Sequence, residues 1–238
     1  MVHGKSKIKK PFINLFGDDV PFQLKFFEFR EHWLEERTKG IGGSDASVIL
    51  GENPYKTSKD LWEEKKGIKE AEDISHKEHV QYGTKAEEHL RNLFALDFPQ
   101  YSVWHVENHT LESKEYPFMR YSADGLLLDC ETGEKGILEV KTTNILASSH
   151  KEKWNNKIPQ NYYIQVLHGL IVTGYDFVIL KAQLRYQFKG ELPKFETKHY
   201  LIRREDVLED IEFLKQAEIE WWNRYMIGNE TPKINLAF

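Results

Sequence analysis

The feature that most constrains the fold of this chain is a change in the spacing of its apolar residues at residue 101. Before that point, apolar side chains recur every three or four residues, as in the stripe Phe22, Phe26, Phe29 and Trp33, which is typical of amphipathic helices. After it, apolar and polar residues alternate in short runs, which is typical of strands. The sequence therefore predicts both helices and a sheet, with the aromatic stripe facing the core.

Turn and capping residues set the expected limits of these elements. Thr57 and Asp60 have the spacing of a capping box, and Gly67 and Gly174 stand where helices are expected to end. We expect helices at 22–36, 44–50, 57–66, 77–96, 159–173 and 205–226. We expect strands at 101–109, 118–122, 124–130, 136–142, 176–184 and 195–203, with a turn at 132–134 (Thr-Gly-Glu) between the third and fourth. This order predicts a mixed α/β or α+β domain.

The charge balance excludes one class of nucleic-acid-binding protein. With 33 Lys and Arg against 38 Asp and Glu, the formal net charge is -5, so the chain cannot coat phosphate by bulk charge. A locally basic surface stays possible, because residues 181–204 hold seven Lys and Arg against two Glu, whereas residues 205–220 are strongly acidic.

The cysteine content and the hydrophobic pattern limit where in the cell we expect this protein. Cys130 is the only cysteine, so no intrachain disulfide can form, and we expect a reducing, cytoplasmic location. No apolar run approaches the length of a membrane span. With no internal repeat or linker, we expect a single domain over 21–238, preceded by a flexible basic segment at 1–20.

The predicted hairpin of residues 124–142 carries the most informative group of polar residues. Because side chains alternate along a strand, Glu139 and Lys141 share one face, and Asp124 stands where the partner strand begins. Folding the hairpin brings the two carboxylates and the ammonium together. Two carboxylates and a backbone carbonyl are hard oxygen ligands of the kind that Mg²⁺ prefers, with Mn²⁺ as an alternative. This chemistry suits metal-assisted phosphodiester hydrolysis, in which Lys141 orients water or offsets charge.

The Glu-x-Lys pattern alone is not specific, because it occurs five times in the chain. Two copies fall in a predicted helix, and a third in a polar stretch before Pro117. The serious rival to Glu139 is Glu196, which lies in a strand-like run with Asp176 upstream. Only Glu139 follows an Asp-Gly strand start through a plausible hairpin, and an ordinary surface charge pair is the alternative explanation.

Several segments, in this order, resemble the lambda-exonuclease/YqaJ viral recombinase family, a branch of the PD-(D/E)XK nuclease superfamily. They span residues 30–180 and are 32–33 (His-Trp), Arg37, 40–46 (Gly-Ile-Gly-Gly-Ser-Asp-Ala), 53–55 (Asn-Pro-Tyr), 61–62 (Leu-Trp), 82–87 (Tyr-Gly-Thr-Lys-Ala-Glu), 122–125 (Ser-Ala-Asp-Gly), 138–141 (Leu-Glu-Val-Lys), 162–166 (Tyr-Tyr-Ile-Gln-Val) and 173–174 (Thr-Gly). The resemblance implies a restriction-endonuclease-like core, in which a mixed central sheet is flanked by helices.

The resemblance also implies roles for individual residues. Asp124, Glu139 and the carbonyl of Val140 match the residues that hold the catalytic metal, and Lys141 matches the water-positioning base or electrostatic stabiliser. Glu87 matches a helix glutamate that supports a second metal, and Gln165 a glutamine directed into the site. Arg37, Ser44 and Ser122 match the residues that form a pocket for a terminal 5′ phosphate.

Each implied role has a structural alternative. Arg37 can simply end a helix, Ser44 can be only the cap of the next one, and Glu87 can pair with Arg91 at i,i+4. Gln165 is harder to dismiss, because a polar side chain in an apolar helix needs a buried partner. His168, three residues later, is expected to be a core histidine with its hydrogen bonds made.

The function implied by the resemblance is a Mg²⁺-dependent exodeoxyribonuclease. It would degrade linear duplex DNA from a 5′ end to mononucleotides and leave a 3′ single strand for phage-type recombination. The resemblance further implies a homotrimer around double-stranded DNA ends, a single-strand annealing protein as partner, and the cytoplasm of the host cell as location. The alternatives are an endonuclease of the same fold and a nuclease-fold module that binds DNA without cutting it.

Overall fold

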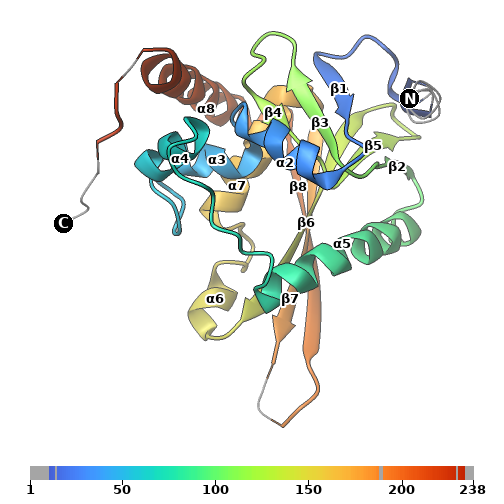
Figure 1. The fold of residues 1–238 in the computed structure, drawn as a ribbon. Coiled ribbons are helices and arrows are strands. Elements are labelled where there is room, and N and C mark those ends of the chain that lie inside the picture. The colour runs from blue at the N-terminus through green and yellow to red at the C-terminus, as the bar shows by residue number, and fades with distance from the viewer. Residues whose placement is uncertain (1–10, 14, 188–189, 229, 234–238) are drawn as a thin grey trace.

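The computed structural model describes residues 11–13, 15–187, 190–228 and 230–233 (Figure 1). Its helices are α2 (Arg30–Thr38), α3 (Gly43–Ile49), α4 (Ser58–Lys65), α5 (Glu78–Asp97), α6 (Ser148–Glu152), α7 (Gln160–Thr173), the 3₁₀ turn η1 (Arg204–Val207), α8 (Leu208–Trp221) and the π-helical turn η2 (Trp222–Ile227). None of the helices in these described ranges is long and apolar enough to span a membrane.

The strands form two sheets. The strands are β1 (Phe22–Phe26), β2 (Tyr101–Trp104), β3 (His109–Ser113), β4 (Arg120–Tyr121), β5 (Gly125–Asp129), β6 (Lys135–Ile145), β7 (Phe177–Tyr186) and β8 (Lys194–Arg203). The central five-stranded sheet has the order β2-β5-β6-β7-β8, in which only β6 and β7 are parallel. A smaller antiparallel sheet has the order β1-β3-β4. The expected mixed sheet flanked by helices is confirmed.

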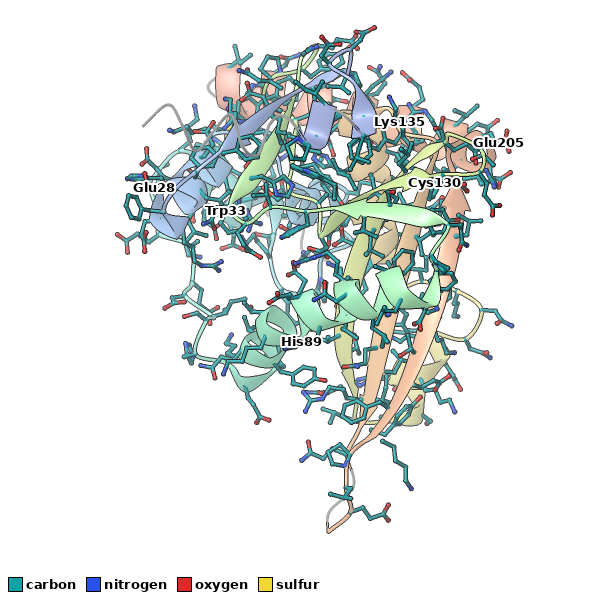
Figure 2. The ribbon with its side chains drawn as sticks, turned by 90° about the vertical axis from the view of Figure 1, so that its right-hand side faces the viewer. Glu28, Trp33, His89, Cys130, Lys135 and Glu205 are labelled. Atoms are coloured by element: carbon teal, nitrogen blue, oxygen red, sulfur yellow. The ribbon has the colours of Figure 1, made fainter. Side chains whose placement is uncertain are left out.

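Helices cover both faces of the central sheet. On one face, Leu90 and Phe94 of α5 pack against Leu138 and Val140 of β6. On the other face, α7 packs against the alternate residues of the same strands, such as Ile137. Figure 2 shows α5, which carries His89, lying across the sheet, and β7 and β8 extend past α5 as a narrow arm in Figure 1. Because strand side chains alternate, β6 presents one residue set to each helix.

Local signals predicted most of the helices well. Helix α4 has the expected capping box, since Thr57 Oγ1 accepts from the N–H of Asp60 at 3.2 Å and Asp60 Oδ2 accepts from the N–H of Thr57 at 3.1 Å. Gly174 follows α7 with a positive φ of 65°, as expected for a helix C-terminus. The segment expected as one helix at 205–226 is instead a 3₁₀ turn, α8 and a π-helical turn.

Two other predicted segments also differ from the structure. Residues 22–36 do not form one helix, because 22–26 pair with β3 as strand β1, and only the later part is helical in α2. The spacing of four between Phe22 and Phe26 also fits a strand in which residues 22, 24 and 26 share a face, and pairing with the distant strand β3 favours the strand. The run 101–109 splits between two sheets at Asn108, whose positive φ of 51° breaks the extended backbone.

The expected boundary at residue 20 also differs. Residues 1–10 lie outside the described ranges. Phe12 and Phe16 are buried, and their rings stack on each other with centroids 5.2 Å apart. Phe16 further stacks on Tyr175, which precedes β7. Phe12 and Phe16 therefore pack with the domain, within the segment that was expected to be flexible.

Most of the positively charged side chains in the basic stretch 181–204 are engaged by other groups of the protein. Lys189 lies outside the described residues. The other six cationic side chains have partners within the fold: Lys181 with Asp97, Arg185 with the ring of Tyr82, Lys194 with Glu191, Lys198 with the Trp154 carbonyl, Arg203 with Glu134, and Arg204 with the Leu170 carbonyl. These contacts stabilise the arm formed by β7 and β8 and the helices around it.

His168 of α7 is a core histidine, as the sequence predicts. It is fully buried, its Nδ1 lies 2.8 Å from Glu218 Oε1, and its Nε2 lies 2.9 Å from the Arg120 carbonyl. Both partners accept hydrogen bonds, so both ring nitrogens must donate. Burial alone would lower the pKa of His168, but Glu218 outweighs it and raises this pKa above its usual value.

The raised pKa of His168 predicts a pH-dependent contribution to stability. The contribution is fully present below about pH 6.5, the usual histidine pKa, and is lost as pH rises through the raised pKa of the folded state. A tenfold gain in proton affinity on folding corresponds to about 1.4 kcal/mol of unfolding free energy. We expect wild-type protein to lose more stability than His168→Gln between pH 6 and pH 9, measured by urea denaturation. Parallel losses in the two proteins would contradict the assignment.

Candidate active site

The β5–β6 hairpin brings the predicted carboxylates together. Gly133 takes the positive φ of 78° that its turn requires, and the register pairs Gly125 with Leu138. This register places Asp124 beside Val140, whose N–H donates to Asp124 Oδ2 at 2.7 Å. The hairpin expected from the sequence therefore forms, and it joins the two segments that carry the predicted site.

Glu139 is the most enclosed carboxylate of the site. Glu139 is 1% exposed, and its side chain points to the α7 side of the sheet. Its Oε1 accepts from Lys141 Nζ at 2.6 Å and from Gln165 Nε2 at 2.6 Å, and its Oε2 accepts from the hydroxyl of Tyr121. Lys141 thus shares the face of Glu139, as the strand alternation predicted, and the amide of Gln165 has the buried partner that its helix required.

The electrostatics of the site are those of crowded carboxylates. Burial, together with the charges of Glu139 and Glu87, raises the pKa of Asp124 well above its usual value. Burial also raises the pKa of Glu87, although Arg91 opposes it. For Lys141, burial alone would lower the pKa, but Glu139 and Asp124 outweigh it and raise this pKa, so the ammonium stays protonated. The site therefore holds negative charge that a bound cation would offset.

Glu87 makes the ion pair that the sequence offered as one explanation, and it also lies in the cavity. Its Oε1 lies 3.2 Å from Arg91 NH1, which is the expected i,i+4 pair on α5. The same guanidinium nitrogen donates to the carbonyl of Asp124 at 2.9 Å. Glu87 also lines the cavity that contains Asp124 and Glu139. The ion pair with Arg91 thus connects α5 to the hairpin and holds Glu87 at the site.

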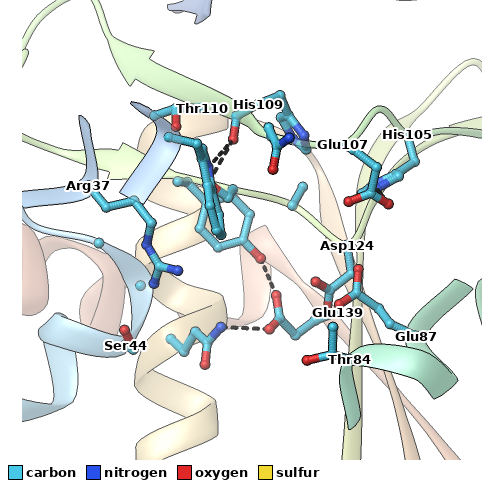
Figure 3. A pocket seen from close by; sticks show the side chains of 18 of the residues that line it. Arg37, Ser44, Thr84, Glu87, His105, Glu107, His109, Thr110, Asp124 and Glu139 are labelled. Atoms are coloured by element: carbon cyan, nitrogen blue, oxygen red, sulfur yellow. Dashed lines mark hydrogen bonds and ion pairs between the residues drawn. The ribbon is translucent and has the colours of Figure 1, made fainter. Parts of the chain in front are cut away.

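Two of the expected phosphate-binding residues, Arg37 and Ser44, lie at the other side of the same cavity (Figure 3), and Ser122 also lines it. The guanidinium of Arg37 lies over the ring of Trp33, 4.8 Å from its centroid. Trp33 Nε1 donates to Ser122 Oγ at 3.2 Å, and Ser122 Oγ in turn donates to the His109 carbonyl at 2.8 Å. Trp33 was expected in the core, but it is partly exposed and lines the cavity.

Ser44 does not cap α3, which differs from the prediction. The N-cap is Gly42, whose N–H donates to Asp45 Oδ2 at 3.0 Å, so the Asp45 carboxylate does the capping. Ser44 is the second residue of the helix and lines the cavity. Its hydroxyl is therefore not needed as a cap.

Lys65 of α4 joins the two segments that carry Arg37 and Ser44. Its Nζ lies 2.7 Å from Asp45 Oδ2 and donates to the Arg37 carbonyl at 3.0 Å, and its side chain is 8% exposed. Burial alone would raise the pKa of Asp45, but Lys65 outweighs it and lowers this pKa below its usual value. One buried ammonium therefore fixes the end of α2 relative to the start of α3.

All eight predicted side chains line one cavity of about 840 Å³: Arg37, Ser44, Glu87, Ser122, Asp124, Glu139, Lys141 and Gln165. Val140, from which only the carbonyl was expected to take part, is not among the lining residues, and its side chain packs against α5. The rival Glu196 is not among the lining residues, and it accepts a hydrogen bond from Tyr186 at 2.7 Å on the arm. The structure thus favours Glu139 over Glu196.

Sequence reasoning missed several residues of the cavity. Tyr121 precedes Ser122 and is buried, and Arg30, His105 and His109 line the cavity wall. Only the alternation of side chains along the strand could have indicated Tyr121, because Tyr121 and Ala123 both face the protein interior. Nothing in the sequence near Arg30, His105 or His109 indicated this cavity, because these residues reach it from α2, the β2–β3 connection and β3.

Comparison with known proteins identifies the family. The YqaJ-like viral recombinase domain matches residues 32–176, which is more than half of the chain. The chain belongs to this family. It is 38% identical over 208 residues to the uncharacterised protein YqaJ of Bacillus subtilis strain 168, covering 87% of the chain and 59% of that protein. The match therefore spans less than two thirds of the relative's length.

The fold is shared with solved nucleases. An alkaline exonuclease from Laribacter hongkongensis matches with a TM-score of 0.57 at 16% identity, over 83% of this chain and 95% of that one. The same enzyme in complex with dAMP matches with a TM-score of 0.54 at 17% identity, over 84% of this chain and all of the other. A phage-related exonuclease from Haemophilus somnus 129PT matches at 0.50 and 11% identity, over 80% and 96%. At these identities the likeness establishes the fold.

Because the Lys65–Asp45 pair is buried, removing Lys65 tests whether this ion pair joins the end of α2 to the start of α3. Removing one partner of a buried ion pair leaves the other charge uncompensated. We expect Lys65→Met to lower the free energy of unfolding by about 3 kcal/mol in urea denaturation. The control is Lys69→Met, which removes the exposed Lys69–Asp60 pair and should leave stability nearly unchanged. Similar losses in both variants would contradict the role of Lys65.

Proposed function

We propose that this protein is a Mg²⁺-dependent exodeoxyribonuclease that degrades linear duplex DNA from a 5′ end, releasing mononucleotides and leaving a 3′ single strand. The observation that carries the proposal is that Asp124, Glu139 and Lys141 share one cavity with Arg37 and Ser44. A hydrolytic centre and a phosphate-binding group in the same cavity suit an enzyme that binds the end of a DNA strand. Membership of a viral recombinase family and the shared fold with exonucleases support the same conclusion.

The donor chemistry of the site fits a hard divalent cation. Among the described residues, no three acidic, histidine or cysteine side chains already converge as a metal site. The proposed ligands are instead two carboxylates, Asp124 and Glu139, and the Val140 carbonyl, which leave positions for water and phosphate oxygen. Glu87 would support a second ion. The raised pKa of Asp124 reflects the unbalanced charge that a cation would relieve. When bound, Mg²⁺ supplies Lewis-acid polarisation of the phosphodiester and a more acidic water.

The protein's own groups have separate tasks in this proposal. Lys141 lies beside Glu139, where it would stabilise the charge that develops on the phosphate or position the attacking water. Gln165 holds Glu139 Oε1 from α7 and so limits the rotation of that carboxylate. The Arg37 guanidinium offers donors to a terminal phosphate, and the Ser44 hydroxyl adds another. The Ser122 hydroxyl would have to turn from the His109 carbonyl to donate to the phosphate.

The wider role follows from the family. We propose that the enzyme acts in phage-type recombination by single-strand annealing, with an annealing protein as partner, and that it assembles as a homotrimer on double-stranded DNA ends. An endonuclease would instead cut closed circular duplex, and a non-catalytic module would bind duplex without cleaving it in Mg²⁺ or Mn²⁺. These outcomes separate the three functions in one set of assays.

Removing either metal-binding carboxylate should abolish cleavage. We expect Asp124→Asn and Glu139→Gln to lower mononucleotide release from linear duplex in Mg²⁺ by more than about 100-fold, since loss of an outer-shell partner alone costs about 10–100-fold. The control is Glu196→Gln, which changes the rival Glu-x-Lys on β8 and should retain the wild-type rate. Undiminished release by either site variant, or no release by the wild type, would refute the proposal.

The end-binding role of Arg37 predicts a preference for 5′-phosphorylated DNA. We expect the wild type to digest 5′-phosphate ends faster than 5′-hydroxyl ends, and Arg37→Ala to lose about 10-fold of this preference, the value of one charge-assisted hydrogen bond. Arg203→Ala, which removes an exposed guanidinium paired with Glu134, is the control. Equal rates on both ends for every protein would remove the phosphate-pocket assignment and leave the nuclease assignment intact.

A further inference from the structure

The hydroxyl of Tyr121 contacts the site but has no role in the function proposed above. Tyr121 ends strand β4, is 2% exposed, and its hydroxyl donates a hydrogen bond to Glu139 Oε2. The other oxygen of Glu139 accepts from Lys141 and Gln165. Three donors from β4, β6 and α7 therefore surround one carboxylate, and Tyr121 is the one that holds Oε2.

The ring of Tyr121 lies in a slot that two glycines form. A Cβ on Gly169 of α7 would lie 2.9 Å from the ring Cζ, which is closer than side chains tolerate. A Cβ on Gly43 of α3 would lie 3.3 Å from the ring Cε2 and 2.9 Å from the Gln165 Cγ. Helix backbones thus flank the ring closely on two sides. Because the ring cannot swing, its hydroxyl stays directed at Glu139.

A carboxylate that binds a metal needs its orientation fixed by groups that do not touch the metal. Such outer partners set which lone pair faces the ion, and their loss typically costs about 10–100-fold in metal affinity. Glu139 rotates about the bonds of a flexible side chain unless both oxygens are held. Lys141 and Gln165 hold only Oε1. The bond from Tyr121 is the one that fixes Oε2, and with it the plane of the carboxylate.

We propose that Tyr121 is a positioning residue that orients Glu139 so that Glu139 and Asp124 bind one divalent cation. This inference rests on the proposed metal-dependent function and deepens it. The phenol acts as a neutral donor, touches neither the cation nor the substrate, and takes no part in proton transfer. Its contribution is therefore to metal affinity and to the geometry of the bound ion.

The test is metal binding without DNA. Tyr121→Phe keeps the ring in its slot and removes only the hydroxyl. We expect its Mn²⁺ affinity, measured by calorimetry and by electron paramagnetic resonance of free Mn²⁺, to fall by about 10-fold or more relative to wild type. The matched control is Tyr175→Phe, because the buried Tyr175 hydroxyl has no partner within the described ranges. Its Mn²⁺ affinity should equal that of the wild type.

The metal dependence of cleavage gives a second measurement. For Tyr121→Phe, the Mg²⁺ concentration for half-maximal nuclease rate should rise by the same factor as the Mn²⁺ dissociation constant, with most of the rate recovered at saturating Mg²⁺. A merely structural role would lower the rate without moving this concentration. Gly169→Ala, which keeps the hydroxyl but displaces the ring, should weaken Mn²⁺ binding as well, and it serves as the test if Tyr121→Phe does not fold.

The outcomes separate the two proposals. Wild-type Mn²⁺ affinity in Tyr121→Phe, or an equal loss in Tyr175→Phe, would overturn the role of Tyr121 and leave the proposed nuclease function standing. Absence of Mn²⁺ binding by the wild type would overturn the metal-dependent function itself.

Discussion

The register of the β5–β6 hairpin is the constraint on which the rest of the site depends. With Gly125 opposite Leu138, Asp124 accepts the N–H of Val140, and Glu139 faces α7 while its neighbours Leu138 and Val140 face α5. A slip of one residue would turn Glu139 toward the apolar side of α5 and move Leu138 into the cavity. The apolar residues that pack against α5 therefore fix the position of Glu139, the proposed metal-binding carboxylate, because any other register would bury charge among them.

Burying Glu139 next to Asp124 is unfavourable unless other groups offset the charge. The protein supplies Lys141, Gln165 and Tyr121 to one carboxylate, and the N–H of Val140 to the other. These donors come from elements far apart in the chain, so the site forms only when β4, β6 and α7 are all in place. A divalent cation at the same point would complete the balance, and this couples metal binding to the integrity of the fold.

Local sequence signals predicted the elements whose limits are set locally. The capping box of α4, the Gly174 stop of α7 and the Gly133 turn are each decided within a few residues, and each is found as expected. Strand β1 was not predictable in this way, because it depends on pairing with β3, more than eighty residues later. The same limit applies to the site. Asp124 and Glu139 follow from one hairpin, whereas the slot around Tyr121 needs glycines from α3 and α7.

The distribution of positive charge also changes once the fold is known. The basic stretch around β7 and β8 suggested a track for DNA, but its described side chains are engaged with carboxylates, carbonyls and an aromatic ring of the fold. The Lys and Arg side chains that line the cavity come from other segments: Arg30 and Arg37 on α2, Lys85 on α5, Arg120 on β4 and Lys141 on β6. With a net charge of -5, attraction to a polyanion must be concentrated where such side chains gather. A phosphate group that reaches the cavity would therefore meet several cations at once, as the proposed end-binding role of Arg37 requires.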